Sequence, residues 1–195
     1  MIAWNFIYDQ EGGLTLMGYV PEGGTGSGVT LAAGVDLGWM PGAEFSGLPP
    51  VLQDKLRRYH GVKGLPARLV LRQYPITITR AEADALMTQK KTGFLHDIRT
   101  RFDRRAPIPF DRIPDGPATA IMDVTWQYGN PWEDPLCGDF WTIATACTWK
   151  ALEANLRDFP DKRFISRRRR AADFLVKAVN IYDGKQAGRA GGVGA

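Results

Sequence analysis

The hydrophobic positions in the first forty residues change from a helical period to short extended runs. Trp4, Tyr8 and Glu11 recur at i, i+4 and i+7, which predicts a short helix over about residues 3–11, ended by Gly12 and Gly13. Three runs of β-favouring residues follow, separated by glycine-rich turns, at residues 17–20, 29–31 and 35–37. We therefore expect a small antiparallel sheet after the first helix.

From residue 48 onward the pattern is mostly helical. Leu52 and Leu56 mark a short helix after Pro50, and the capping box from Thr79 to Glu82 predicts a longer helix that reaches about Phe102. Further helices are expected from residue 117 to Gly129, at 140–147, at 149–157, and after Pro160 to about residue 179. The chain is thus predicted to be α+β and mostly α, with an N-terminal helix and small antiparallel sheet followed by a helical bundle.

A chain of 195 residues suits one domain, which we expect over residues 1–183. Within it we expect a small β-containing lobe at about 12–40 and a helical lobe at about 48–180. The tail, residues 184–195, is rich in Gly and Ala and is predicted to be disordered. Because no apolar run approaches the roughly 18 residues that span a bilayer, no membrane segment is expected.

Charge and the rarer residue types limit the chemistry. A net charge of +4 and a pI of about 9.2 suit an anionic polymer, either a nucleic acid or the acidic bacterial wall. The two cysteines, Cys137 and Cys147, are read as small buried hydrophobes, with a bond between them as the alternative. His60 and His96 are far apart and belong to no ligand motif, so neither a metal nor another cofactor is expected.

Glu11 is the first candidate for chemistry. It shares a helix face with two aromatic residues, and it lies in the last turn of the predicted helix. Partial burial and the negative end of the helix dipole both favour a protonated carboxyl, which a general acid requires. The alternative is an ordinary solvent-facing glutamate at a frayed helix end.

Thr30 and Asp36 are candidates for the second group that a glycosidase needs across the bond that it cleaves. Alternation along short strands could present both side chains to one cleft. The glycines around them, Gly34 and Gly38 among them, would let a sugar polymer approach the backbone closely. Taken singly, Asp36 is as well explained by a turn and Thr30 by an ordinary strand position.

Three segments in this region resemble the active site of the pesticin-type lysozymes, relatives of phage lysozymes found in bacteriocins, endolysins and type VI secretion effectors. The segments are Glu11-Gly-Gly-Leu, Gly18-Tyr-Val-Pro21 and Ser27-Gly-Val-Thr-Leu-Ala-Ala-Gly-Val-Asp-Leu-Gly38. The resemblance implies that Glu11 is the catalytic acid and that Thr30 and Asp36 hold the hydrolytic water. As in the pesticin type, the threonine precedes the aspartate.

The resemblance continues downstream and covers roughly residues 2–180. It includes Thr125-Trp-Gln-Tyr-Gly129, the pair Phe140-Trp141, and segments 155–159 and 166–175. One departure is Thr148 before Trp149, where the family leads us to expect an aspartate; threonine can also cap a helix.

Sugar-binding residues are harder to assign. Gln127 and Tyr128 could line the saccharide cleft. Alternatively, Gln127 is part of a solvated helix end and Tyr128 is a core residue. For Tyr19 a sugar contact and a structural role are likewise both possible from the sequence. The four arginines from Arg167 to Arg170 suggest phosphate binding, but four consecutive helical residues point in different directions. No aromatic–basic motif accompanies them, so a structural or wall-binding role is expected, with no nucleic-acid partner.

The sequence as a whole predicts a muramidase that cleaves the glycan strands of peptidoglycan. We expect it to be a monomer and to invert the configuration at the anomeric carbon. A lytic transglycosylase and a non-catalytic cell-wall-binding module are the alternatives. No secretory signal is visible, so we expect synthesis in the cytoplasm and action in the periplasm or on the wall after delivery. A holin would deliver an endolysin, and a secretion system would deliver an antibacterial effector, which would require an immunity protein.

Overall fold

The structure is a computed structural model that describes residues 1–21 and 26–190, with side chains described as far as residue 178. Residues 22–25, part of the predicted glycine-rich turns, lie outside the described residues. So do residues 191–195 of the tail, for which the predicted disorder stays a prediction, whereas residues 184–190 of the predicted tail belong to a helix.

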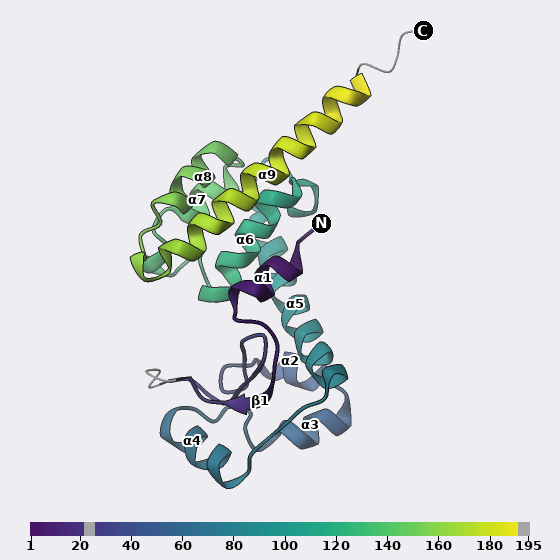
Figure 1. Cartoon of the computed structure of the whole chain (residues 1–195), viewed down its shortest axis with the longest axis vertical. Coiled ribbons are helices and arrows are strands. Elements are labelled where there is room, and N and C mark those ends of the chain that lie inside the picture. The colour runs from purple at the N-terminus through teal and green to yellow at the C-terminus, as the bar shows by residue number, and fades with distance from the viewer. Residues whose placement is uncertain (22–25, 191–195) are drawn as a thin grey trace. The chain divides into compact units, whose positions relative to one another are not determined.

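The described chain begins with a helix and a small sheet and continues with helices (Figure 1). The predicted fold class, α+β and mostly α with a lysozyme-like arrangement of elements, is confirmed. The elements are α1 (Trp4–Gln10), β1 (Thr15–Tyr19), β2 (Thr30–Ala32), β3 (Val35–Asp36), α2 (Gly42–Ser46), α3 (Pro50–Leu56), α4 (Gly64–Gln73), α5 (Arg80–Phe102), η1 (Phe110–Arg112), α6 (Asp115–Tyr128), η2 (Pro135–Cys137), α7 (Phe140–Thr145), α8 (Trp149–Arg157), η3 (Lys162–Phe164) and α9 (Ile165–Ala190).

The chain divides into two compact units. The sheet-containing unit is Tyr8–Gly93, and the helical unit is Met1–Ile7 together with Phe94–Ala195. The sheet-containing unit therefore holds α2, α3, α4 and the first part of α5 in addition to the predicted β-containing lobe at 12–40. Whether the units form one domain over 1–183 stays a prediction.

The sheet of the first unit is antiparallel, with strand order β1-β2-β3. Its middle strand is the most buried: Thr30, Leu31 and Ala32 are each no more than 3% exposed. The predicted capping box begins α5, since the Thr79 N–H donates to Glu82 Oε2 at 2.7 Å and the Glu82 N–H donates to Thr79 Oγ1 at 3.2 Å.

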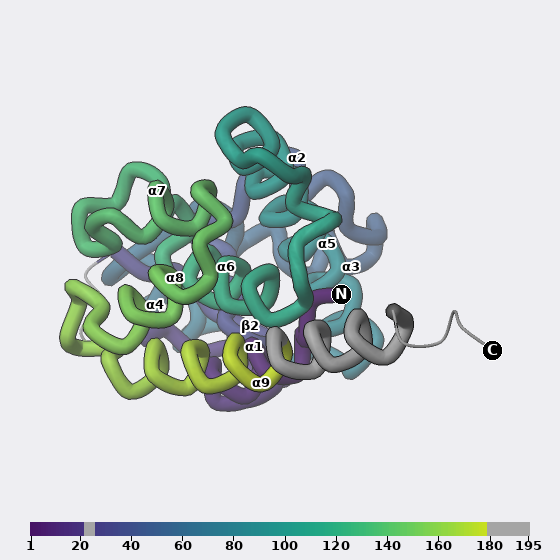
Figure 2. The backbone as a smooth tube through the Cα atoms, turned by 90° about the horizontal axis from the view of Figure 1, so that it is seen from above, coloured from purple at the N-terminus to yellow at the C-terminus, as the bar shows by residue number. Residues whose placement is uncertain are grey.

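The helical unit is built around α6, most of which is buried. Helix α9 packs along both α6 and α8 (Figures 1 and 2). Trp126 of α6 contacts Trp4, with ring centroids 5.9 Å apart, and Phe94, at 5.3 Å. These edge-to-face and tilted aromatic pairs join the N-terminal helix to the centre of the unit.

Several predicted helix ends need correction. Helix α6 begins at Asp115 rather than at residue 117, because Pro114 can precede the first turn. Helix α9 ends at Ala190 rather than near residue 179. Thr148 does not cap α8 with its side chain, and its hydroxyl donates instead to the Ala146 carbonyl at 3.4 Å. The cysteines are both free. Cys137 is fully buried, as predicted, but the prediction that Cys147 is buried too was wrong, since Cys147 is only partly buried.

Asp123 holds two of the four consecutive arginines inside the helical unit. Its Oδ1 accepts from Arg167 Nη2 at 2.8 Å and from Arg167 Nε at 3.1 Å, and its Oδ2 pairs with Arg168 Nη1. Asp123 and Arg168 are fully buried and Arg167 is 8% exposed. Burial lowers the pKa of the Arg168 guanidinium, and the Asp123 carboxylate opposes that shift. Arg167 and Arg168 are therefore structural, while Arg169 and Arg170 are exposed.

Asp123→Asn is expected to lower the free energy of unfolding by about 3–5 kcal/mol, because two buried guanidinium groups lose their shared carboxylate. Denaturant unfolding monitored by circular dichroism measures the loss. Asp54→Asn is the control, since Asp54 pairs with Arg57 on the surface and an exposed pair contributes about 1 kcal/mol or less. A loss as small for Asp123→Asn as for Asp54→Asn would contradict this view of the cluster.

Candidate active site

Glu11 lies in the turn directly after α1. Its backbone N–H donates to the Tyr8 carbonyl at 3.0 Å, and the N–H of Gly13 donates to the same carbonyl at 3.1 Å. Gly12 and Gly13 adopt φ values of +79° and +88°, which side-chain-bearing residues rarely adopt. The two glycines thus reverse the chain immediately after Glu11. Glu11 is therefore held in the tight turn between the end of α1 and the start of β1.

The carboxylate of Glu11 lies against the turn that joins β2 to β3. Its Oε2 is 3.0 Å from the position that a Cβ on Gly34 would occupy. Gly34 has φ +74°, so a glycine serves both the turn and the close approach of the acid. The Lys90 ammonium of α5 donates to the Gly34 carbonyl at 2.6 Å. Gly34 therefore contacts two charged side chains: the Glu11 carboxylate lies against its Cα, and the Lys90 ammonium is hydrogen-bonded to its carbonyl.

Tyr19, Thr30 and Asp36 form a row across the three strands. Tyr19 pairs with Thr30 in the register of β1 and β2, and Thr30 pairs with Asp36 in the register of β2 and β3. Directly paired residues of antiparallel strands project from the same face of the sheet. The sequence-based expectation that Thr30 and Asp36 share a face is therefore met by the strand register, and Tyr19 joins them.

Backbone amides fix the orientation of the Asp36 carboxylate. The Gly38 N–H donates to Oδ1 at 2.8 Å, and the Gly28 N–H is shared between Oδ1 at 3.0 Å and Oδ2 at 3.1 Å. A Cβ on Gly28 would stand 2.6 Å from Oδ1, so only glycine allows this approach. The oxygens keep further lone pairs, since an ionised carboxylate accepts about four hydrogen bonds.

The charges of both candidate carboxylates act on the phenol of Tyr19. Burial raises the pKa of Tyr19, and the negative charges of Glu11 and then of Asp36 raise it further. Tyr19 is nevertheless 42% exposed, whereas Thr30 beside it is 3% exposed. The site thus contains two carboxylates that both act electrostatically on a partly exposed phenol, with a buried threonine hydroxyl in the same row.

Gln127 and Tyr128 lie in the helical unit, at the end of α6. The Tyr128 hydroxyl donates to Asp161 Oδ2 at 3.0 Å, and the Gln127 carbonyl accepts from Arg168. The Tyr128 ring packs against Phe159, with centroids 5.9 Å apart. Both side chains therefore make structural contacts within their unit, and their predicted contacts with sugars stay predictions.

Sequence reasoning missed Lys90 and Gly28. Lys90 belongs to the Gln-Lys-Lys stretch of α5, and nothing in its local pattern marks it as different from a solvated helix residue. Gly28 does carry a signal, because it lies inside the Ser-Gly-Val-Thr run that was singled out. Its use is specific: it brings a backbone N–H to Asp36.

No group of three or more His, Cys, Asp or Glu side chains able to hold a metal ion is found among the described residues. None of the helices described combines the length and apolar character needed to cross a membrane. A cavity of about 520 Å³ in the sheet-containing unit is lined by residues of α3, α4 and the segment that follows, and none of the predicted catalytic residues lines it.

The sheet, the helices and the presence of Glu11, Thr30 and Asp36 in one unit agree with a lysozyme-like glycosidase. The chain belongs to the Pesticin family, described as a bacterial toxin homologue of phage lysozyme, C-terminal part, whose model matches residues 1–150. The resemblance seen in the sequence is thereby confirmed over those residues. No curated protein matches the chain. Membership supports, at the level of the family, a lysozyme-like muramidase and hence a glycoside hydrolase that acts on peptidoglycan.

Gly34→Ala is expected to lower kcat/KM by about tenfold, because the added methyl displaces the Glu11 carboxylate by a few tenths of an ångström. Gly61→Ala is a matched control: Gly61 has φ +76°, so it carries similar backbone strain, but nothing lies within 4 Å of an added Cβ. The rate of peptidoglycan clearing by both variants measures the difference. Equal losses in the two variants would show that backbone strain alone is responsible.

Proposed function

We propose that the protein is a muramidase that hydrolyses the β-1,4 bond between N-acetylmuramic acid and N-acetylglucosamine. The observation that carries the proposal is the arrangement in the sheet-containing unit. Thr30 and Asp36 are paired across β2 and β3, and the carboxylate of Glu11 lies against the turn between these two strands. Both carboxylates act electrostatically on Tyr19, the partner of Thr30 on β1.

In the proposed reaction Glu11 is the general acid. Its proton passes to the glycosidic oxygen as the bond from that oxygen to the anomeric carbon breaks. Asp36 accepts a proton from a water molecule whose oxygen forms the new bond to the anomeric carbon. Attack from the face opposite the leaving group inverts the configuration at that carbon.

The backbone around Asp36 suits the role of base. Two amide N–H groups orient its carboxylate, and among the described residues the one donor found to Oδ2 is the shared Gly28 N–H, at 3.1 Å. A lone pair of Oδ2 is therefore left for a water molecule. Thr30 is the paired residue on the adjacent strand, and we propose that its hydroxyl assists in holding that water.

Tyr19 is proposed to contact the saccharide. Its phenol is protonated at neutral pH, since burial and the two carboxylates raise its pKa above the ordinary value of 10.0, and it can donate a hydrogen bond to a sugar hydroxyl or N-acetyl group. Its exposed ring offers an apolar face to a pyranose. Gln127 and Tyr128 are retained as proposed substrate contacts on the basis of sequence alone.

Product analysis tests the proposal. Purified peptidoglycan is digested with the protein, and the soluble fragments are examined by mass spectrometry. Hydrolysis gives fragments with reducing N-acetylmuramic acid ends. Anhydro-muramic ends would instead show a lytic transglycosylase, and retention of the protein on insoluble wall without any release of fragments would show a binding module.

For the biological role we propose an antibacterial toxin, in keeping with the description of the family. Such a protein would reach the peptidoglycan through a secretion system and require an immunity protein in the producing cell, whereas an endolysin would depend on a holin. We propose that it acts as a monomer in the periplasm or on the wall. Toxicity when the protein is directed to the periplasm, relieved by co-expression of a neighbouring gene, distinguishes the effector from the endolysin.

A further inference from the structure

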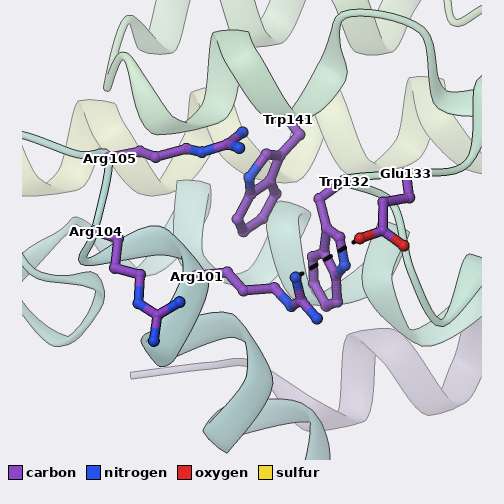
Figure 3. Close-up of a pocket in the computed structure, with 6 residues that line it drawn as sticks. All are labelled: Arg101, Arg104, Arg105, Trp132, Glu133 and Trp141. Carbon is purple, nitrogen blue, oxygen red and sulfur yellow. Dashed lines mark ion pairs between the residues drawn. The ribbon is translucent and has the colours of Figure 1, made fainter.

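A small cationic cavity in the helical unit takes no part in the proposed reaction. It has a volume of about 140 Å³ and lies between the end of α5, the turn after α6, and α7 (Figure 3). Ligand pockets for drug-sized molecules hold about 300–1,000 Å³. This cavity therefore suits one small group of a larger ligand. Its lining residues are Arg101, Arg104, Arg105, Trp132, Glu133 and Trp141.

The lining carries an excess of positive charge. Three arginines and one glutamate give a formal charge of +2. Arg101 lies 3.9 Å from Glu133, and that glutamate also accepts from Asn130 Nδ2 at 2.6 Å. Among the side chains described, those of residues 1–21 and 26–178, neither Arg104 nor Arg105 has an acidic partner. Two guanidinium groups are thus available to an anion.

The walls of the cavity are aromatic. The rings of Trp132 and Trp141 meet at 68° with centroids 5.2 Å apart, and the Arg101 guanidinium lies 4.5 Å from the Trp132 ring centroid. Figure 3 shows Arg105 extending toward Trp141. The indole N–H of Trp132 is buried and has no acceptor among the described residues. A buried donor of this kind is normally satisfied, and an oxygen of a bound ligand can satisfy it.

We propose that this cavity binds a carboxylate of the acidic peptide that branches from the glycan strands. Guanidinium forks match the two oxygens of a carboxylate, and indole walls suit a small apolar neighbour such as an alanine methyl group. A nucleic acid would need a longer cationic track for its successive phosphates. The choice of the peptidoglycan peptide as the source of the carboxylate rests on the proposed function.

Binding of a free peptide tests the inference without any glycosidic bond. The probe is the dipeptide L-alanyl-D-glutamate, and the same dipeptide with both carboxylates amidated is its control. Titration calorimetry on the whole protein measures the binding of both. We expect the dipeptide to bind at least about tenfold more tightly than the diamide, since charge-assisted bonds are lost in the latter. Inorganic phosphate, as a third probe, is expected to bind more weakly than the dipeptide.

Variants locate the binding. Arg104→Gln combined with Arg105→Gln is expected to weaken dipeptide binding by at least about tenfold. Arg112→Gln, which removes another exposed arginine of the same unit, should leave it unchanged. Equal binding of dipeptide and diamide, or no effect of the double variant, would overturn the inference. Phosphate binding as tight as that of the dipeptide would also overturn it, in favour of a general anion site.

Kinetics separate this inference from the proposed function. On peptide-bearing glycan the double variant is expected to raise KM with little change in kcat, whereas on glycan stripped of its peptides it should behave like the unmodified protein. If Glu11→Gln kept its activity, the proposed function would fail while the dipeptide titration could still succeed. If the titration failed while Glu11→Gln was inactive, only the inference about the cavity would fall.

Discussion

Glu11→Gln is expected to lower the rate of peptidoglycan hydrolysis by about 10²–10⁴-fold, the contribution typical of a general acid. Glutamine keeps the size of the side chain and its position against Gly34, but it cannot supply the proton that the leaving oxygen needs. The initial rate at which a suspension of purified peptidoglycan clears, measured at equal protein concentration, gives the loss directly.

Asp9→Asn is the matched control for this change. Asp9 is an exposed acid two residues earlier, on α1, and its replacement removes the same charge without touching the site. We expect Asp9→Asn to clear peptidoglycan at close to the unmodified rate. Near-normal clearing by Glu11→Gln, with its circular dichroism spectrum unchanged, would remove Glu11 from the mechanism.

Asp36→Asn is expected to have the second largest effect on activity, again about 10²–10⁴-fold. The amide is a far weaker base than the carboxylate. It also places an NH₂ group where one oxygen now accepts from a backbone N–H of Gly28 or Gly38, so that two donors would face each other. The measurement is kcat on soluble glycan fragments, which separates the chemical step from binding to the insoluble wall.

Thr30 provides a graded comparison for Asp36. Thr30→Ala removes a hydroxyl that only assists in holding water, so we expect a smaller loss, of about 10²-fold. Thr30→Ser restores the hydroxyl and should recover most of the activity. If Asp36→Asn cost no more than Thr30→Ala, Asp36 would not be the base.

Much of the sheet-containing unit follows from local signals. Gly12 and Gly13 end α1 because both adopt positive φ, and the Thr79–Glu82 box begins α5 through two reciprocal hydrogen bonds. Helix α4 was missed because its apolar residues do not form a buried stripe: Leu65 and Leu69 are exposed, and Ala67 alone is buried. Periodicity detects a helix through the face that it buries, and α4 buries almost none.

The candidate site shows the same division between local and long-range information. Alternation along short strands was enough to predict a shared face for Thr30 and Asp36. The approach of Glu11 to Gly34 and the bond from Lys90 to the Gly34 carbonyl join residues far apart in sequence, so no local pattern encodes them. A structural or wall-binding role was expected for the four arginines, but their buried partner Asp123 lies 44 residues before Arg167 and 45 before Arg168, so no local pattern identifies the cluster.

The central claim is that a water molecule held by Asp36 and Thr30 attacks the face opposite the bond that Glu11 protonates. Proton NMR of the products in the first minutes of hydrolysis, before the anomers equilibrate, tests it most directly. Because the substrate bond is β, the mechanism predicts that the α-anomer of the new reducing end forms first. Initial formation of the β-anomer would contradict it and would indicate a retaining reaction.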